Sequence, residues 1–271
     1  MELTKLLNEF IAECEYKNLS PITIRNYRSI IGEFINSISI TNIEELDRHI
    51  IKDYIYNLPI ATSSKNQCLR CISAFWHWYE YEYDMDLNIR VKRLKEKQQI
   101  KYTPSDEEVK KLKEYYTNKK YIGSRNKTII YTFVNLGLRG NELINLKKAD
   151  LDLNNNIITV RNRKGDIDQQ LPINKELRLQ LIRYVNKYDI NSEYLFVSKN
   201  NKKMAISNLH YLLSKTRINN NINPHSLRRY CCTNMLKSGI PITMVSRFMN
   251  HSSIEVTNSY YADIKATDIV F

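Results

Sequence analysis

Apolar side chains recur at helical spacing along most of this chain of 271 residues. In its first part they return every three to four positions in four stretches, a period that is typical of amphipathic helices. The four predicted helices begin near Leu3, Ser20, His49 and Ser64. Ser20 followed by Pro21 is typical of a helix start, because serine caps the first turn and proline suits the first helical position. The pattern predicts a small all-helical domain at residues 1–87.

Residues 88–101 are polar and basic and show no clear period. Such a segment is typical of an exposed connector between domains. Thr103-Pro104 and Asp106 then predict the start of a new helix, because a capping residue, a first-turn proline and a first-turn acid occur together. We therefore expect a second domain at residues 102–271.

This second domain is predicted to be mostly helical with one β-hairpin. Two β-rich runs, 157–160 and 170–173, flank Gly165, which suits a turn that needs positive φ. Further helices are predicted at 125–136, 139–147, 175–188, 207–218, 224–238 and 253–261. The expected fold class is mainly α (α+β): a small helical domain, then a larger one that adds a small antiparallel sheet to its helices.

Positive charge is concentrated in the second part of the chain. The formal net charge is +12, and residues 1–97 hold 13 Lys and Arg against 14 Asp and Glu, whereas the remaining residues hold 28 against 15. A basic domain of this kind attracts polyanions, of which nucleic acid is the usual one in a soluble protein. The charge distribution therefore indicates a nucleic-acid partner for the second domain.

The cysteines and the apolar runs indicate the compartment. Five cysteines, an odd number, fit reduced thiols better than a disulfide framework. Cys68-x-x-Cys71 has no second pair at metal-ligand spacing, so free thiols are the preferred interpretation over a zinc site. No apolar run approaches a membrane span, and the amino terminus lacks the pattern of a secretory signal. We expect a cytoplasmic protein without a membrane partner.

Several residues with reactive or charged side chains lie in the second domain. Arg139 follows a tight Gly-Leu turn and opens a predicted helix, and Glu142 shares its face three residues later. His225 and Arg228 occupy positions i and i+3 in the first turns of another predicted helix. Each pair taken alone is more often a surface pair than a functional site.

His251 and Tyr260 complete this set near the end of the chain. With 19 tyrosines in the sequence, a single tyrosine is more often a packing residue. In this company, however, the set supplies the cations, proton carriers and hydroxyl nucleophile that metal-free attack on a phosphodiester requires. Asp150 and Asp152 are interpreted as turn residues, and no carboxylate cluster favours a metal-dependent nuclease.

The order and spacing of these residues resemble the tyrosine recombinases and phage-type integrases, and within them the compact Xer-like members. The matching boxes are Gly137-Leu138-Arg139-Gly140-Asn141-Glu142, a hairpin Lys164, His225-Ser226-Leu227-Arg228, His251 and Tyr260. The segment Leu19-Ser20-Pro21-x-Thr23 is similar to the core-site binding domain of the family, so the resemblance covers nearly the whole chain. The sequence departs from the family at Asn250, where Gly is usual, and at Gln169-Gln170, where an Arg is common.

The resemblance implies a role for each residue. Arg139 and Arg228, with a hydrogen bond from His251, would stabilise the non-bridging oxygens of the scissile phosphate. Tyr260 would attack phosphorus and form a 3′-phosphotyrosyl link. Tyr261 stays open as the alternative nucleophile, since neighbouring helical positions point about 100° apart and only one reaches the phosphate.

Proton transfer is assigned in the same way. His225 would activate the tyrosine as a base, and Lys164 would protonate the leaving 5′-oxygen. Arg161 and Arg163 beside it would lower the pKa of Lys164, because like charges disfavour the ammonium form. Glu142 would orient Arg139.

The resemblance also implies the partners. Candidate DNA contacts are Arg25, Arg28, Lys65, Arg70, Arg161 and Arg163. The expected substrate is double-stranded DNA with paired inverted half-sites, bound by a homotetramer on two duplexes, with a partner recombinase left open. No cofactor, no metal and no small-molecule substrate is expected. Integration, excision, resolution and inversion through a Holliday junction all fit, and the alternatives are a type IB topoisomerase and a family member that binds DNA without cleaving it.

Overall fold

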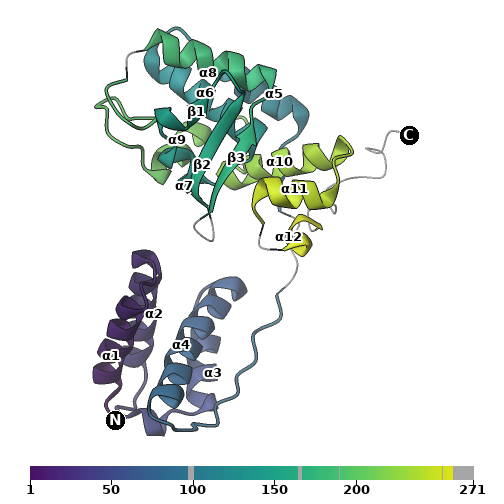
Figure 1. Cartoon of the computed structure of the whole chain (residues 1–271). Coiled ribbons are helices and arrows are strands. Elements are labelled where there is room, and N and C mark those ends of the chain that lie inside the picture. Colours follow the sequence, from purple (N-terminus) through teal and green to yellow (C-terminus); the bar gives the residue numbers. More distant parts are fainter. Residues whose placement is uncertain (97–100, 164–166, 189, 252, 259–271) are drawn as a thin grey trace. The chain divides into compact units, whose positions relative to one another are not determined.

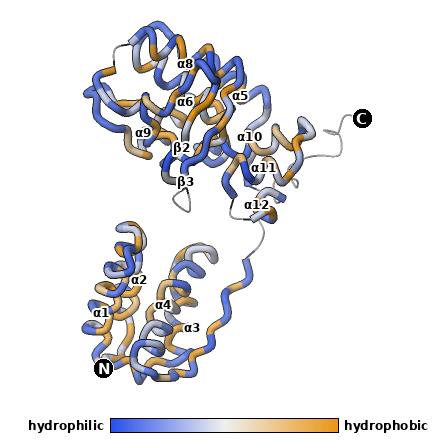
Figure 2. Tube along the Cα trace, in the orientation of Figure 1, coloured by the Kyte–Doolittle hydropathy of each residue, from blue (hydrophilic) through white to orange (hydrophobic). Residues whose placement is uncertain are grey.

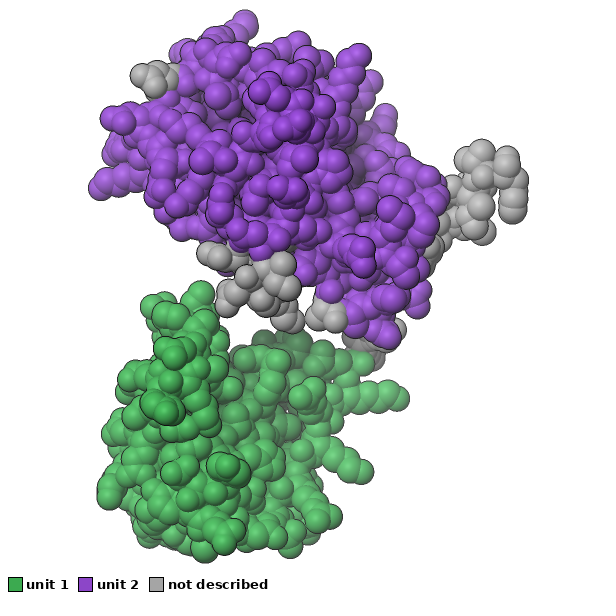
Figure 3. Space-filling view, in the orientation of Figure 1, with its two compact units in different colours: residues 1–98 green, residues 99–271 purple. Residues whose placement is uncertain are grey.

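The computed structural model describes residues 1–96, 101–163, 167–188, 190–251 and 253–258. The chain divides into two compact units, residues 1–98 and 99–271 (Figure 3). Helices dominate both units, and the second unit also contains a three-stranded antiparallel sheet. The predicted fold class is thereby confirmed. No helix in the described ranges combines the length and the apolar character needed to cross a membrane.

The first unit is built from four helices that run beside one another (Figure 1). They are α1 (Leu3–Tyr16), α2 (Pro21–Ser37), α3 (Arg48–Asn57) and α4 (Thr62–Glu82), with a short 3₁₀ turn η1 (Ile43–Glu45) before α3. Apolar and polar stretches follow one another along each helix (Figure 2), the pattern that places apolar side chains on one face of an amphipathic helix. The Oγ atom of Ser20 accepts a hydrogen bond of 3.1 Å from the backbone N–H of Thr23, so the predicted cap is present.

Aromatic rings fill the core of the first unit. Phe10 and Phe75 pack edge to face with ring centroids 5.7 Å apart, and Trp76 and Tyr79 are also buried. Such pairs add stability beyond the apolar area that they bury. The core is therefore held together mainly by apolar contacts.

The segment after α4 is attached to the first unit at two points, Ile89 and Leu94. Ile89 is buried, and the side chain of Asn66 both donates to the carbonyl and accepts from the N–H of Leu94, each at 2.9 Å. Most described residues of this segment, 88, 90 and 92–96, are exposed, as expected for a connector. One buried apolar side chain and one amide attach it to the first unit.

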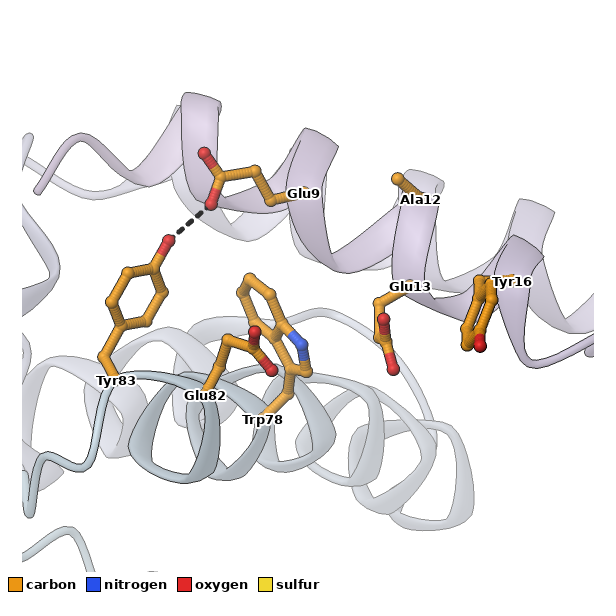
Figure 4. A pocket seen from close by; sticks show the side chains of 7 residues that line it. All are labelled: Glu9, Ala12, Glu13, Tyr16, Trp78, Glu82 and Tyr83. Carbon is orange, nitrogen blue, oxygen red and sulfur yellow. Dashed lines mark hydrogen bonds between the residues drawn. The ribbon is translucent and has the colours of Figure 1, made fainter.

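A pocket of about 420 Å³ opens in the first unit, lined by residues of α1, of the last turns of α4 and by Tyr83 (Figure 4). Its lining combines carboxylates with aromatic rings: Glu9, Glu13, Glu82, Tyr16, Trp78 and Tyr83, together with Ala12. The Tyr83 hydroxyl donates to Oε2 of Glu9 at 2.5 Å, and this bond raises the pKa of Tyr83 to about 12. An acidic lining repels phosphate, and none of the candidate DNA contacts lies in it.

In the second unit several helices pack around one helix, α6 (Tyr121–Leu136) (Figure 1). Its helices are α5 (Asp106–Tyr115), α6 (Tyr121–Leu136), α7 (Gly140–Asn145), α8 (Lys175–Lys187), α9 (Ile206–Ser214), α10 (Pro224–Lys237), α11 (Ile242–Met249) and α12 (Ile254–Asn258), with a 3₁₀ turn η2 (Lys148–Asp150). Helix α6 packs against α5, α8 and α10 and buries Ile129, Ile130 and Phe133. The end of α6 is therefore fixed in the core.

The sheet has the order β1 (Leu151–Asp152), β2 (Ile157–Arg163) and β3 (Ile167–Pro172), all antiparallel. Ile158 pairs with Leu171, and both side chains are buried. The predicted hairpin is thus present, whereas the short strand β1 was not predicted. The hairpin turn, which includes Lys164 and Gly165, lies outside the described residues.

Candidate active site

Gly137 connects the central helix to the candidate site. It caps α6 in the left-handed conformation, with φ of +56°, and a Cβ added there would lie 2.8 Å from Cε of Met249 and 3.2 Å from Cβ of Cys231. Both the backbone conformation and the close packing therefore require glycine. The turn that leads to Arg139 is held against α10 and α11, the helices that carry or precede the other candidate residues.

Arg139 is oriented by a buried carboxylate and by the end of α11. Its Nη1 donates to Oε1 of Glu142 and its Nη2 to the carbonyl of Asn250, both at 2.8 Å. The second carboxylate oxygen of Glu142 accepts from the backbone N–H of Arg139, also at 2.8 Å. The predicted orienting contact between Glu142 and Arg139 is present in the structure.

Arg228 is the more deeply buried of the two arginines, with 4% of the residue exposed. Its Nη1 donates to the carbonyl of Gly137 at 2.6 Å, and its Nη2 donates to the carbonyl of Met249. Nη1 also lies 4.0 Å from Oε2 of Glu142. The last carbonyls of a helix lack partners within the helix, and cations are favoured there. Arg228 thus joins the ends of α6 and α11.

Asn250 adopts the left-handed conformation, at the position where the resemblance gives glycine as the usual residue. Its φ of 51° and ψ of 55° end α11, and the N–H of His251 then bonds to the carbonyl of Ser246 at 3.1 Å. Asparagine tolerates this conformation better than most residues with a side chain. The substitution therefore preserves the turn that presents His251.

His251 is held through its side chain as well. Its Nδ1 lies 2.8 Å from Oγ1 of Thr257, a fully buried residue of α12. The sequence reasoning did not identify Thr257. A contact six residues along the chain and across a turn does not match the helical spacing of three or four, so helical periodicity gives no signal for it.

His225 lies in the first turn of α10, next to Arg228. The start of this helix is fixed by Asn223, whose Oδ1 accepts from the N–H of Ser226 at 3.0 Å. Partial burial of the ring, and then the positive charges around it, with Arg228 foremost and Arg139 contributing, lower the pKa of His225. The lowered pKa favours the neutral imidazole.

The structure brings five predicted site residues together: Arg139, Glu142, Arg228, His225 and His251. Lys164, Tyr260 and Tyr261 lie outside the described residues, as does the side chain of Arg163. The assignments of those residues stay predictions.

A hollow of about 630 Å³ lies beside His251. It is lined by β3 residues 168–170, by polar residues of α11 and by Asn250 and His251. Nε2 of Gln169 donates to the carbonyl of Arg247 at 3.0 Å, which attaches β3 to the end of α11. The hairpin strand, the end of α11 and His251 therefore line one depression. Within the described residues, no group of three or more His, Cys, Asp or Glu is arranged to hold a metal ion.

Arg161, in the half of β2 that leads to the hairpin turn, is engaged by two carboxylates, those of Asp150 and Asp168. Its Nε donates to Oδ1 of buried Asp150 at 2.6 Å, and this hydrogen bond raises the pKa of Arg161. Asp150 also accepts from the N–H of Lys147 at 2.8 Å, so it acts as the predicted turn residue and as an anchor for Arg161. About half of the Arg161 side chain, 51%, is exposed to solvent, so it can still contact a ligand.

The candidate DNA contacts of the first unit have mixed surroundings. Arg25 is exposed on α2, and Arg28 is exposed with Nη2 at 3.8 Å from a carboxylate oxygen of Glu15. Lys65 donates to the carbonyl of Tyr56 at 2.6 Å, in the last turn of α3, and Arg70 donates to the side chain of Gln67. Lys65 therefore stabilises the end of a helix in addition to its predicted role.

Two family models match the chain: the phage integrase family over residues 103–267 and the N-terminal SAM-like domain of phage integrases over residues 6–102. Tyrosine recombinase XerA of Pyrococcus furiosus is 28% identical over 265 residues, which cover 95% of this chain and 89% of that protein. XerA of Pyrococcus horikoshii is 33% identical over 161 residues, 58% of this chain and 55% of that protein. Its match, like those of the XerA proteins of Thermococcus kodakarensis and Thermococcus onnurineus, thus spans about half of the relative's length.

Solved structures share the fold. An integrase of transposon Tn1549 in complex with transposon right end DNA is similar with a TM-score of 0.78 and 17% identity, covering 99% of this chain and 97% of that one. A lambda integrase dimer bound to a core site gives a TM-score of 0.79 at 13% identity, covering 98% and 97%. At these identities the likeness establishes the arrangement of helices and strands.

Proposed function

This chain belongs to the phage integrase family of tyrosine recombinases, and from that premise we propose that it is a site-specific recombinase that cleaves and rejoins DNA through a 3′-phosphotyrosyl intermediate. The observation that carries the proposal is the pair Arg139 and Arg228, which meet at the carboxylate of Glu142 and at the end of α11, directly before His251.

The arginine pair stabilises the charge that develops during attack. A phosphodiester gains negative charge on its non-bridging oxygens as a fifth bond to phosphorus forms, and fixed donors lower the energy of that state. A guanidinium has five N–H donors. The bonds from Arg139 to Glu142 and Asn250 fix its orientation, and donors are left to meet a phosphate oxygen. His251 adds a further hydrogen bond.

The chemical steps use groups that this chain supplies. The Oη atom of Tyr260 attacks phosphorus, its proton passes to His225, and the 5′-oxygen leaves with a proton from Lys164. The lowered pKa of His225 keeps its imidazole neutral and able to accept that proton. The phosphotyrosyl ester retains the bond energy, so the reverse attack by a 5′-hydroxyl rejoins DNA without a cofactor.

The assembly follows from the same premise. Two subunits bind inverted half-sites on one duplex, and a tetramer on two duplexes exchanges strands through a Holliday junction in the cytoplasm. A solved relative, the recombinase XerH, was crystallised on a palindromic substrate in a post-cleavage complex. The basic second half of this chain, with 28 Lys and Arg against 15 Asp and Glu after residue 97, suits contact with two phosphate backbones.

Covalent capture tests the proposal. Genomic fragments retained by the protein would supply the binding site, and a nicked duplex built on it would trap the intermediate in the presence of EDTA. We expect the wild type to give a protein–DNA adduct on a denaturing gel, Tyr260→Phe to give none, and Tyr261→Phe to keep it. Absence of an adduct from the wild type would refute the proposal, and relaxation of supercoiled DNA without the site would favour a topoisomerase.

A further inference from the structure

Helix α12 is attached to the rest of the second unit through an unusual residue. Of its five residues, Ile254 to Asn258, only Thr257 is buried, with 0% of its surface exposed, while Ile254 and Val256 are exposed at 47% and 38%. An amphipathic helix normally buries its apolar residues. The buried residue of α12 is instead a threonine, and its hydroxyl lies 2.8 Å from Nδ1 of His251.

We propose that Thr257 is a positioning residue for His251: its hydroxyl donates to Nδ1, which keeps the proton of the neutral imidazole on Nε2. This inference rests on the proposed function, because it specifies how His251 reaches the phosphate. In a neutral imidazole one nitrogen donates and the other accepts. A proton on Nε2 makes that nitrogen a donor to a phosphate oxygen, whereas the opposite tautomer would direct a lone pair at an anion.

Two contacts together define the ring position. The backbone N–H of His251 is bonded to the carbonyl of Ser246 at 3.1 Å, which fixes the main chain, and the bond to Thr257 fixes the orientation of the side chain. A partner that hydrogen-bonds one ring nitrogen of a functional histidine sets the tautomer of the ring and directs the other nitrogen. Thr257 also precedes Tyr260 by three residues, so one hydroxyl ties His251 to the segment that carries the proposed nucleophile.

Substitutions at Thr257 separate this role from simple packing. Thr257→Val keeps the shape and removes the hydroxyl, and Thr257→Ser keeps the hydroxyl. A matched control is Thr132→Val, since Thr132 is also fully buried but its hydroxyl donates to the carbonyl of Thr128 at 2.8 Å within α6. In single-turnover cleavage of the nicked duplex, we expect Thr257→Val to lose about 10- to 100-fold, as is typical when an orienting partner is removed, and Thr257→Ser and Thr132→Val to stay close to wild type.

The tautomer of His251 can be measured by nitrogen NMR of the free protein, so this test needs neither DNA nor a cleavage assay. In the wild-type protein with ¹⁵N-labelled histidine, at a pH where His251 is neutral, we expect Nε2 to show the shift of a protonated nitrogen and Nδ1 that of an unprotonated one. Thr257→Val should show a mixture of tautomers. A wild-type His251 protonated on Nδ1, or a Thr257→Val variant that cleaves at the wild-type rate, would overturn the inference. If the wild type itself does not cleave the nicked duplex, the proposed function is refuted instead.

Discussion

The two compact units differ in what they bury. Among the described residues, the first unit buries a single polar side chain, Asn66, whereas the second buries fourteen, including Arg125, Glu142, Asp150 and Arg228. A buried polar group that loses its partner costs about 1–3 kcal/mol, so each of these groups restricts where its partner lies. The first unit is therefore a core of apolar contacts, whereas the second is a scaffold in which polar bonds fix the positions of particular atoms.

Buried arginines illustrate the difference within the second unit. Arg125 donates to the carbonyl of Val197 at 2.6 Å and to the side chain of Asn126, away from the candidate site. Burial lowers the pKa of Arg125. Arg228 performs the same structural task at the ends of α6 and α11 and also faces the site. Comparing the two arginines separates structural support from catalysis.

The largest effect is expected for Arg228→Ala. The substitution leaves the carbonyls of Gly137 and Met249 and the carboxylate of Glu142 short of a partner, which should cost about 3–5 kcal/mol of unfolding free energy. Loss of a phosphate-stabilising donor should also slow cleavage by at least about 10²-fold. Urea unfolding and single-turnover cleavage measure the two effects. Arg125→Ala should lose stability but cleave at close to the wild-type rate while folded; equal cleavage defects in both variants would remove the distinction.

The glycines test how specific the packing around the site is. Gly137→Ala should cost about 2–4 kcal/mol, because left-handed strain adds to overpacking against Met249. Gly239 has φ of +79° but no atom within 4 Å of an added Cβ, so Gly239→Ala should cost only about 1–2 kcal/mol of strain.

In the first unit, Gly32 lies within α2, and an added Cβ would meet only Leu7 at an ordinary contact distance. Gly32→Ala should therefore raise the free energy of unfolding by about 0.5–1 kcal/mol. Urea denaturation gives all three values, and similar losses at Gly137 and Gly239 would contradict the packing argument.

Asn66 is the one residue with an amide or charged side chain that is buried in the described part of the first unit, and its contacts can be tested. Asn66→Ala removes both hydrogen bonds to Leu94 and the one to Glu96, at about 0.5–1.5 kcal/mol each, and should release the residues around Leu94 from α4, while Ile89 stays buried. Hydrogen exchange at the Leu94 amide should become faster, while that of core amides in α1 should change less. Asn8→Ala, at an exposed position of α1, serves as the control. Unchanged protection of Leu94 would mean that other contacts hold the segment.

The smallest effect concerns His225 and pH. Because its pKa is lowered in the folded protein, the neutral form is favoured there, and protonation favours the unfolded chain. The contribution of His225 to the free energy of unfolding is fully present above the ordinary pKa of about 6.5, and it is lost as the pH falls through the lowered pKa. His225→Gln should flatten this part of the stability curve. The acid limb of kcat/KM for cleavage should lie below about 6.5 as well; a limb above that value would contradict the assigned base.

Much of the fold can be predicted from periodicity and caps. The helices of the first unit begin close to the predicted positions, and the hairpin is formed by the two predicted strands. Helix α11, only eight residues long, was not predicted, and neither was the two-residue strand β1. Elements this short depend on tertiary contacts, such as the packing of Met249 against Gly137, more than on local preference.

The candidate site was predicted as a set of side chains but not as a network. The resemblance indicated Arg139, Arg228 and His251, yet three of the bonds that hold the arginines go to backbone carbonyls. One of them joins Arg139 to Asn250, which lies 111 residues away in the sequence. Backbone acceptors carry no residue identity, so no sequence motif marks them. Thr257 escaped notice for a related reason: its burial becomes visible only when α12 folds against His251.

The central claim is that the arginine pair neutralises charge on the non-bridging oxygens of one phosphate. A duplex with a methylphosphonate at the scissile position carries one charge less there and tests the claim directly. Arg139→Ala should cleave the ordinary nicked duplex far more slowly than the wild type and should recover most of the deficit on the methylphosphonate duplex. An equal deficit on both duplexes would contradict the account.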